Sequence, residues 1–284
     1  MNRSIRLLRE SLGQPRPLVM GVLNVTPDSF SDGGRFRNAD AAIEQAERMA
    51  ADGADIIDIG GESTRPGAED VALDEERQRV LPVLEALAGR VSTPLSVDTS
   101  KPALMAEAVA AGAALVNDVR ALHEPGAVEA VASTDALVCL MHMQGQPRTM
   151  QQAPHYDDVV REVGDFLDAR VQSCVAAGIA RERLVLDPGF GFGKTLAHNL
   201  TLLKHLDGLQ GRLQLPLLVG MSRKRMIGTI LGGAPAEARL HGSVAVAVMS
   251  ADRGARIVRA HDVRPTREAL EVVAAVHGAD HAQG

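Results

Sequence analysis

Basic residues are grouped in this sequence in a way that favours phosphate chemistry. Only four of the 30 basic residues are lysines, and Lys101, Lys194 and Lys224 each come shortly after an apolar run. The segment 222–224 (Ser-Arg-Lys) follows one apolar run, and 259–261 (Arg-Ala-His) ends the next. Arginine presents a planar fork that matches phosphate oxygens. The two clusters therefore predict a phosphate site, although Lys224 taken alone could be an ordinary surface charge.

Carboxylates and amides also follow apolar runs. An Asp, Ser or Thr in such a place commonly caps the next helix, and Ser100, just before a Lys-Pro pair, fits that role. Capping does not explain Asp98, which ends the run at 95–97, or the neutral amides Asn24 and Asn117. We expect these side chains to face a binding site.

A glycine-rich segment at 188–195 (Pro-Gly-Phe-Gly-Phe-Gly-Lys-Thr) resembles a phosphate-binding P-loop. The spacing excludes that motif, because Pro188 occupies the position where its first glycine must lie. We interpret the glycines as a loop that crosses a binding site beside a flat ligand. The aromatic residues favour the same interpretation, because Phe30, Phe36, Phe190 and Phe192 lie in glycine-rich segments while Phe166 is predicted on a helix.

These candidates are separated by an alternation of short β-rich runs and longer Ala/Leu-rich segments of helical period. The predicted strands are 18–24, 55–59, 94–98, 115–119, 136–142, 184–187, 216–221 and 256–261. The predicted helices are 40–52, 74–90, 103–111, 126–132, 156–177, 197–206, 236–253 and 266–277.

Eight strand-helix units with nearly continuous apolar strands predict one fold class, a single (β/α)8 TIM barrel of parallel strands. Its active site is expected at the C-terminal ends of the strands. An open doubly wound sheet is the alternative, but it would more naturally use five to seven strands. We expect one domain at 18–277, an N-terminal segment at 1–17 that closes one end as a strand or a helical turn, and a frayed tail at 278–284.

Composition excludes several classes of protein. Hydrophobic residues make up 45% of the 284 residues and the formal net charge is −6, so no global basic field indicates nucleic acid or an anionic membrane. No apolar run reaches the roughly 18 residues of a membrane span. Cys139 and Cys174 lack metal-ligand spacing and suit a reducing compartment, so a cytoplasmic location is expected.

Taken together, eight motifs in this order make the chain resemble the dihydropteroate synthase family of folate biosynthesis. They are GVLNVTPDSFSDGG at 21–34, DIGGESTRPG at 58–67, SVDTSK at 96–101, ND at 117–118, MHMQG at 141–145, LDPGFGFGK at 186–194, GMSRK at 220–224 and RAHD at 259–262. The resemblance covers the chain from Leu18 to about Val273.

The resemblance implies a synthase that joins 6-hydroxymethyl-7,8-dihydropterin diphosphate to p-aminobenzoate, with Mg²⁺ as cofactor and no nucleic-acid or membrane partner. A homodimer is also implied, and the Ala/Val-rich helix at 236–253 could supply its surface. The diphosphate leaves first, and the neutral amine then attacks the resulting pterin cation. Asp98 and Asp32 would favour that cation electrostatically.

Site residues carry over from the family by motif. The pterin would be held by Asp98, Asn117, Asp187 and Lys224, with Met141 and Phe192 lining its pocket. The diphosphate would be bound by Thr64, Arg259 and His261, and Gly220 would be a further substrate-binding residue. The closing loops and the p-aminobenzoate pocket would use Phe30, Asp32, Arg65, Pro66 and Ser222, and Asn24 would bind Mg²⁺. Asp98, Asp32 and Lys224 are the expected catalytic residues.

Three other functions stay open at this point. A pterin-binding methyltransferase domain that serves a corrinoid partner could share the pterin-reading Asp and Asn residues, but it would not need Asn24, Arg259 and His261. A non-catalytic paralogue could bind pterin as a regulator. A Schiff-base aldolase that uses Lys224 is a more distant alternative.

Overall fold

The computed structural model describes residues 2–26, 35–63, 70–146 and 149–279. These residues form eight parallel strands that close into a barrel in chain order, because β1 pairs with both β2 and β8. The strands are β1 (Leu18–Asn24), β2 (Ile56–Gly60), β3 (Leu95–Asp98), β4 (Leu115–Asp118), β5 (Leu137–Met141), β6 (Leu184–Asp187), β7 (Leu217–Val219) and β8 (Ala255–Ala260). The predicted (β/α)8 barrel is confirmed.

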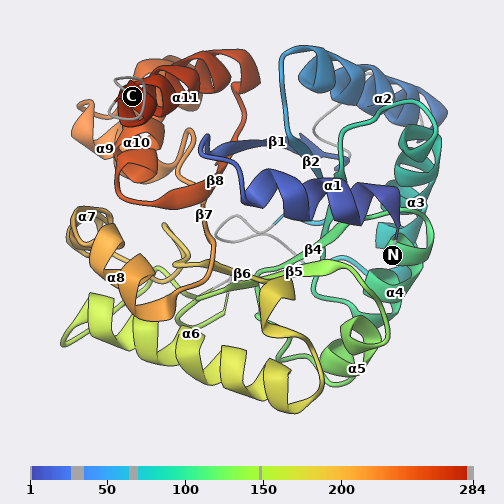
Figure 1. Ribbon diagram of the computed structural model, residues 1–284, viewed down its shortest axis with the longest axis horizontal. Helices are drawn as coiled ribbons and strands as arrows, with labels where there is room; N and C mark the ends of the chain where they lie inside the picture. Colours follow the sequence, from blue (N-terminus) through green and yellow to red (C-terminus); the bar gives the residue numbers. More distant parts are fainter. Residues whose placement is uncertain (1, 27–34, 64–69, 147–148, 280–284) are drawn as a thin grey trace.

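Helices surround the strands as an outer ring (Figure 1). They are α1 (Arg3–Leu12), α2 (Arg35–Ala51), α3 (Leu73–Ala88), α4 (Pro102–Ala110), α5 (Ala127–Ala132), α6 (Val159–Ala176), α7 (Leu196–Lys204), α8 (Leu206–Leu213), α9 (Arg225–Ile230), α10 (Leu240–Asp252) and α11 (Val263–Gly278). Two 3-10 turns, η2 (Arg181–Arg183) and η3 (Ala236–Arg239), precede β6 and α10.

The outer ring differs from the sequence prediction in places. The helices α8 and α9 were not predicted, and the segment predicted as one helix at 236–253 is divided into η3 and α10. After α9, Gly232 and Gly233 have positive φ values, which end helical geometry. Phe36 lies in α2, so its predicted place in a loop is wrong, and Gly278 ends α11 where a frayed tail was expected.

Strand side chains alternate between the barrel interior and the helices, as the two-residue period of a strand requires. In β1, Leu18 and Met20 belong to the interior apolar cluster, while Val19 and Leu23 pack in the cluster that includes the outer helices. Two residues further along, the inward position becomes polar on four strands: Asp58 after Ile56, Asn117 after Leu115, Asp187 after Val185 and Arg259 after Ile257. The interior is therefore apolar at its N-terminal end and polar at its C-terminal end.

Helix α1 lies across the apolar, N-terminal end of the barrel (Figure 1). Ile5 and Leu8 are buried against the interior cluster, and the Asn2 side chain caps the helix by accepting the backbone N–H of Ser4. The Arg256 guanidinium donates to the carbonyls of Leu12 and Pro15, at 2.9 and 3.0 Å, which ties the end of this segment to β8. The N-terminal segment thus closes the barrel as a helix of ten residues.

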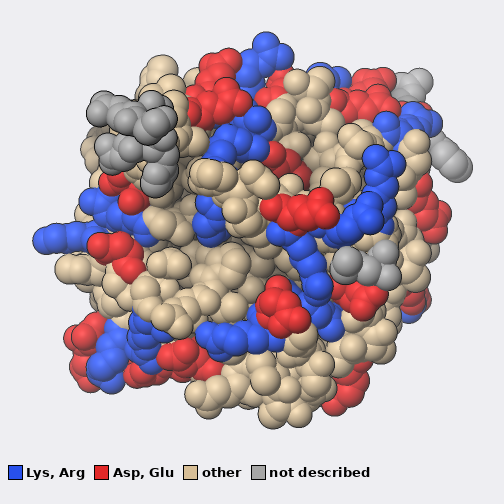
Figure 2. Space-filling model, viewed as in Figure 1, with Lys and Arg blue, Asp and Glu red and all other residues tan. Residues whose placement is uncertain are grey.

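Acidic and basic side chains are interspersed over the face that α1 covers (Figure 2). Such mixing gives no extended field of one sign there. Among the described residues, no helix has the length and apolar content that crossing a membrane requires.

We expect Leu8→Ala to lower the free energy of unfolding by about 2–4 kcal/mol, because it leaves a cavity between α1 and the interior cluster. The neighbouring Leu7 is half-buried, so Leu7→Ala on the same helix should cost less than half as much. Urea denaturation of both variants measures the difference. Equal losses would contradict the role given to Leu8.

Candidate active site

The C-terminal end of the barrel gathers polar side chains from successive strands. The register sets Asp98 of β3 beside Asn117 of β4, and Met141 of β5 beside Asp187 of β6. Asn24 of β1 lies beside Gly60, and Gly60 lies beside Asp98. These predicted residues are thereby brought to one end of the barrel, as expected.

Asp58 is the centre of the hydrogen-bond network at this end. Its carboxylate is fully buried and accepts the Ser96 hydroxyl at 2.6 Å, the Asn117 amide at 3.0 Å and the Arg259 Nε at 2.6 Å. The donors come from β3, β4 and β8, so one carboxylate fixes side chains of three strands. Asp58 was not among the predicted site residues, although a lone carboxylate within Ile-Ile-Asp-Ile was a signal for it.

Arg259 joins the two carboxylates of this network. Besides its contact with Asp58, its guanidinium donates to Asp98 at 2.9 Å. Burial and the charge of Asp58 raise the pKa of Asp98 to about 7, while Arg259 opposes that rise. Burial lowers the pKa of Arg259, but the two carboxylates outweigh it and the net shift is upward. Arg259 therefore stays charged, and Asp98 changes its charge near neutral pH.

Lys224 and Asp187 meet at the glycine-rich loop after β6. The Asp187 carboxylate accepts the backbone N–H of Gly189 at 2.7 Å, and the Lys224 ammonium donates to the Phe190 carbonyl. The same ammonium lies 4.5 Å from the centre of the Phe192 ring. Burial raises the pKa of Asp187 and lowers that of Lys224 to about 8, and each charge opposes the shift of the other.

Only part of the predicted aromatic grouping faces this end of the barrel. Phe190 is completely buried in the core, so the expectation that it contacts a ligand is wrong. Phe192 is partly exposed beside Lys224, and its place in the pocket lining stays a prediction.

The two basic clusters, 222–224 after β7 and 259–261 at the end of β8, contact each other. Ser222 accepts the backbone N–H of His261 at 3.1 Å, and its hydroxyl lies 3.1 Å from the His261 Nδ1. Arg223 adopts a φ of 57° and pairs with Asp262, its Nε donating at 2.9 Å. Of the cluster 222–224, Ser222 and Lys224 therefore remain at the candidate site, while Arg223 is held in an ion pair.

Gly220, another predicted site residue, lies beside Arg259. A Cβ added at Gly220 would lie 3.7 Å from the Arg259 Cβ, which is an ordinary van der Waals contact.

The other two lysines that follow strands are also engaged. Lys101 donates to the carboxylates of Glu62 and Glu76, and Glu76 is fully buried. Lys194 is enclosed beneath the glycine-rich loop. Both follow predicted strands, and the charges of both are used inside the protein. Five predicted residues lie outside the described residues: Phe30, Asp32, Thr64, Arg65 and Pro66.

This arrangement can recognise a flat, polar ring. Asp98, Asn117 and Asp187 offer carboxylate and amide groups on the inward side of three strands, where an unmade hydrogen bond is costly. Among the described residues, no group of three or more His, Cys, Asp or Glu side chains could hold a metal ion.

Comparison with known proteins agrees with this geometry. A family model described as pterin binding enzyme matches residues 20–261. The dihydropteroate synthase of Escherichia coli K12 is 56% identical over 265 residues, which cover 93% of each chain.

Solved structures give the same result. The Yersinia pestis dihydropteroate synthase, solved in a sulfonamide drug complex, is 57% identical with a TM-score of 0.88 and covers 93% of this chain and 95% of its own. The Xanthomonas albilineans enzyme in complex with 7,8-dihydropteroate is 47% identical with a TM-score of 0.82 and covers 94% of both chains. The resemblance predicted from the motifs is confirmed: the chain belongs to the dihydropteroate synthase family of pterin-binding enzymes.

Proposed function

We propose that this chain condenses 6-hydroxymethyl-7,8-dihydropterin diphosphate with p-aminobenzoate, giving 7,8-dihydropteroate and diphosphate. The observation that carries the proposal is the polar inward layer formed by Asp98, Asn117 and Asp187. The relatives' names and the product bound to the Xanthomonas albilineans enzyme support the same reaction. Within this proposal, Met141, Phe192 and Gly220 line the pterin pocket and Lys224 interacts with the ring.

The chemistry proceeds by loss of diphosphate before amine attack. The bond between the methylene carbon and the diphosphate oxygen breaks, and its electron pair leaves with the diphosphate. The electron-rich dihydropterin delocalises the resulting positive charge, which an ionised Asp98 favours electrostatically. The lone pair of the neutral amine then forms the new C–N bond, and one N–H proton is released. An aromatic amine needs no strong base for this step, and Asp32 is proposed to assist Asp98.

Binding of the diphosphate is proposed to involve Thr64, Arg259 and His261. Arg259 and His261 come from the end of β8, and Ser222 contacts His261 from the end of β7. Phosphate sites at these two strand ends are common in (β/α)8 barrels. The p-aminobenzoate pocket is proposed to use Phe30, Asp32, Arg65, Pro66 and Ser222.

Mg²⁺ is the proposed cofactor, with Asn24 as its protein ligand. An amide oxygen is a hard donor that suits Mg²⁺, which commonly keeps several water and phosphate ligands. Asn24 ends β1, the strand that pairs with β8, so it lies at the same end of the barrel as Arg259 and His261. When bound, Mg²⁺ would neutralise charge that builds on the departing diphosphate.

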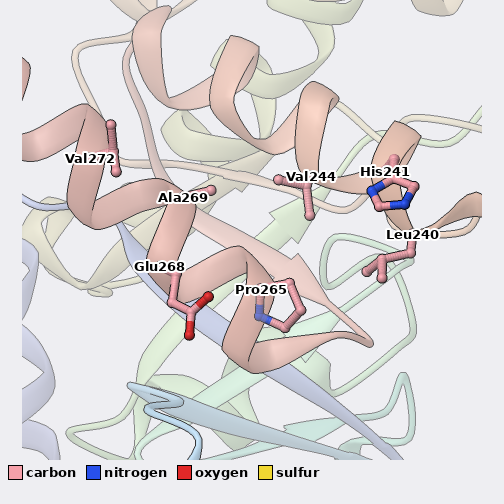
Figure 3. A pocket seen from close by; sticks show the side chains of 7 residues that line it. All are labelled: Leu240, His241, Val244, Pro265, Glu268, Ala269 and Val272. Carbon is pink, nitrogen blue, oxygen red and sulfur yellow. The ribbon is translucent and has the colours of Figure 1, made fainter.

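A homodimer is proposed through the outer faces of α10 and α11. An open groove of about 420 Å³ lies between them, lined by His241 and Val244 on one side and Ala269 and Val272 on the other (Figure 3). Val272 is 65% exposed, Val276 is 66% exposed and Met249 is 42% exposed on the same two helices. A second copy of the chain would remove this apolar surface from water.

A cytoplasmic location is proposed as well. Cys139 and Cys174 are both buried and free of disulfide bonds. Such unpaired cysteines suit a reducing compartment.

The proposed reaction is tested by incubating the protein with pterin diphosphate, p-aminobenzoate and Mg²⁺ and measuring diphosphate release. We expect release only when both substrates are present, and Asp98→Asn should reduce kcat by at least about 100-fold because the cation loses its counter-charge. Circular dichroism should show that the variant is folded. Binding of pterin without turnover would favour the non-catalytic paralogue, and near-normal turnover of the variant would refute the role of Asp98.

We also expect activity to depend on pH through Asp98. Its pKa is raised to about 7, so below that pH the carboxyl is mostly protonated and cannot favour a cation. The kcat/KM for pterin diphosphate should fall by about tenfold per pH unit below pH 7 and level off above it. Asp98→Asn is the control, since it keeps the titration of the substrate phosphate. If kcat/KM fell in the same way below pH 7 in both proteins, the fall would be due to titration of the substrate and not of Asp98.

The dimer proposal predicts that Val272→Glu yields a monomer, because it places a charge on the apolar surface of α11. Light scattering during gel filtration measures the mass of each protein. Val175→Glu is the matched control, since Val175 is 43% exposed on α6, away from the groove. A monomeric native protein, or loss of the dimer in the control alone, would contradict the proposal.

A further inference from the structure

Lys194 is a buried charge that the proposed reaction does not use. Its side chain is only 3% exposed, and its ammonium lies 2.8 Å from the Nδ1 of His142. It also donates to the carbonyls of Gly189 and Phe192, at 2.9 and 3.1 Å. The three N–H bonds of the ammonium therefore have three acceptors, one from the end of β5 and two from the loop after β6.

That loop, residues 188–193, rests directly on the backbone that follows β5. A Cβ at Gly189 would lie 1.8 Å from the His142 carbonyl oxygen, and one at Gly193 would lie 2.3 Å from the Gln144 carbonyl oxygen. Both glycines also have positive φ values, at 70° and 61°. The Tyr156 hydroxyl donates to the Gly193 carbonyl at 2.9 Å. The loop is thus fixed from beneath, and Lys194 is the charged part of that support.

The opposite side of the same loop contacts the active site. Lys224 donates to the Phe190 carbonyl and lies against the Phe192 ring. Asp187 accepts the N–H of Gly189, the residue whose carbonyl Lys194 holds. A shift of the loop would therefore move three groups that we place around the pterin.

We infer that Lys194 is a positioning residue, whose ammonium, with His142 as acceptor, sets the loop 188–193 and through it Lys224, Phe192 and Asp187. The inference rests on the proposed function, because it assigns these three groups to the pterin half of the reaction. In the proposed reaction, Lys194 contacts none of the reacting atoms.

The protonation state of His142 agrees with this role. Burial and the charge of Lys194 lower the pKa of His142 to about 3, so the ring is neutral and its Nδ1 can accept a hydrogen bond. Burial lowers the pKa of Lys194 to about 7, and Asp187 opposes that shift. The three acceptors around the ammonium favour its charged form.

A purely structural role for Lys194 would lower stability without distinguishing the two substrates. A positioning role predicts a selective effect, because the loop contacts Lys224 and Asp187 on the pterin side. The decisive quantity is therefore the ratio of KM for pterin diphosphate to KM for p-aminobenzoate. The thermal unfolding midpoint of each variant is measured as well.

The test compares Lys194→Met with Lys204→Met, in which an exposed lysine at the end of α7 is changed in the same way. We expect Lys194→Met to raise KM for pterin diphosphate by about 10-fold to 100-fold, with KM for p-aminobenzoate within about twofold of the native value. Lys204→Met should change neither. Equal changes in both KM values, or a lower melting temperature with an unchanged ratio, would overturn the inference.

His142 supplies a second pair of variants in case Lys194→Met does not fold. Asparagine can accept from Lys194 through its Oδ1, so His142→Asn should keep the native ratio, whereas His142→Leu should raise KM for pterin diphosphate selectively. An equal rise in KM for pterin diphosphate in His142→Asn and His142→Leu would overturn the inference.

Calorimetry with 6-hydroxymethylpterin separates this inference from the proposed reaction. Lack of turnover by the native protein would reject the proposed function. Turnover by the native protein, with pterin binding of the same strength in Lys194→Met or His142→Leu, would reject only the positioning role.

Discussion

A buried ion group of Asp58, Asp98 and Arg259 is the interaction on which the rest of this site depends. Charges inside a barrel are costly unless they are paired and hydrogen-bonded. Arg259 meets this requirement by binding both carboxylates, and Asp58 accepts further hydrogen bonds from Ser96 and Asn117. The orientation of Asn117 is therefore coupled to the same charges that set the pKa of Asp98. Removing one partner would leave the others buried without compensation.

The barrel can hold this group because its interior is divided along the strand direction. The apolar half contains residues such as Met20, Ile56 and Ile257, and α1 covers it with Ile5 and Leu8. Burial of that half stabilises the fold, and the two-residue strand period then presents the polar half to the open end. The residues that stabilise the fold and the residues of the candidate site thus lie in different layers of the same strands. Changes in the apolar layer should affect unfolding more than substrate recognition.

The sequence predicted the strands and their polar ends because both follow from local pattern, apolar runs that stop at a charged or amide residue. It did not predict which charges pair. Arg259 binds Asp58 across 201 positions and Asp98 across 161 positions. Arg259 lies at the end of β8 and Arg223 shortly after β7, yet Arg223 pairs with Asp262 at the barrel rim. The two arginines differ in which strands the closed barrel places beside them, and no short-range sequence pattern encodes that pairing of strands. Phe190 was misplaced for the same reason, since a glycine-rich segment can pack inward as well as outward.

Charge balance limits how a diphosphate can enter this site. Among the described residues, Arg259 is held by two carboxylates, Arg223 by Asp262, and Lys101 by two glutamates. Lys224 donates to a loop carbonyl and has Asp187 as its nearby counter-charge. If Arg259 moved toward the diphosphate, Asp58 and Asp98 would repel each other without their shared cation. A divalent ion that arrives with the diphosphate would supply further positive charge, so that Arg259 could contact the diphosphate without leaving Asp58 and Asp98. The ion group in the polar, C-terminal layer of the barrel therefore supports the proposal that Mg²⁺ accompanies the diphosphate.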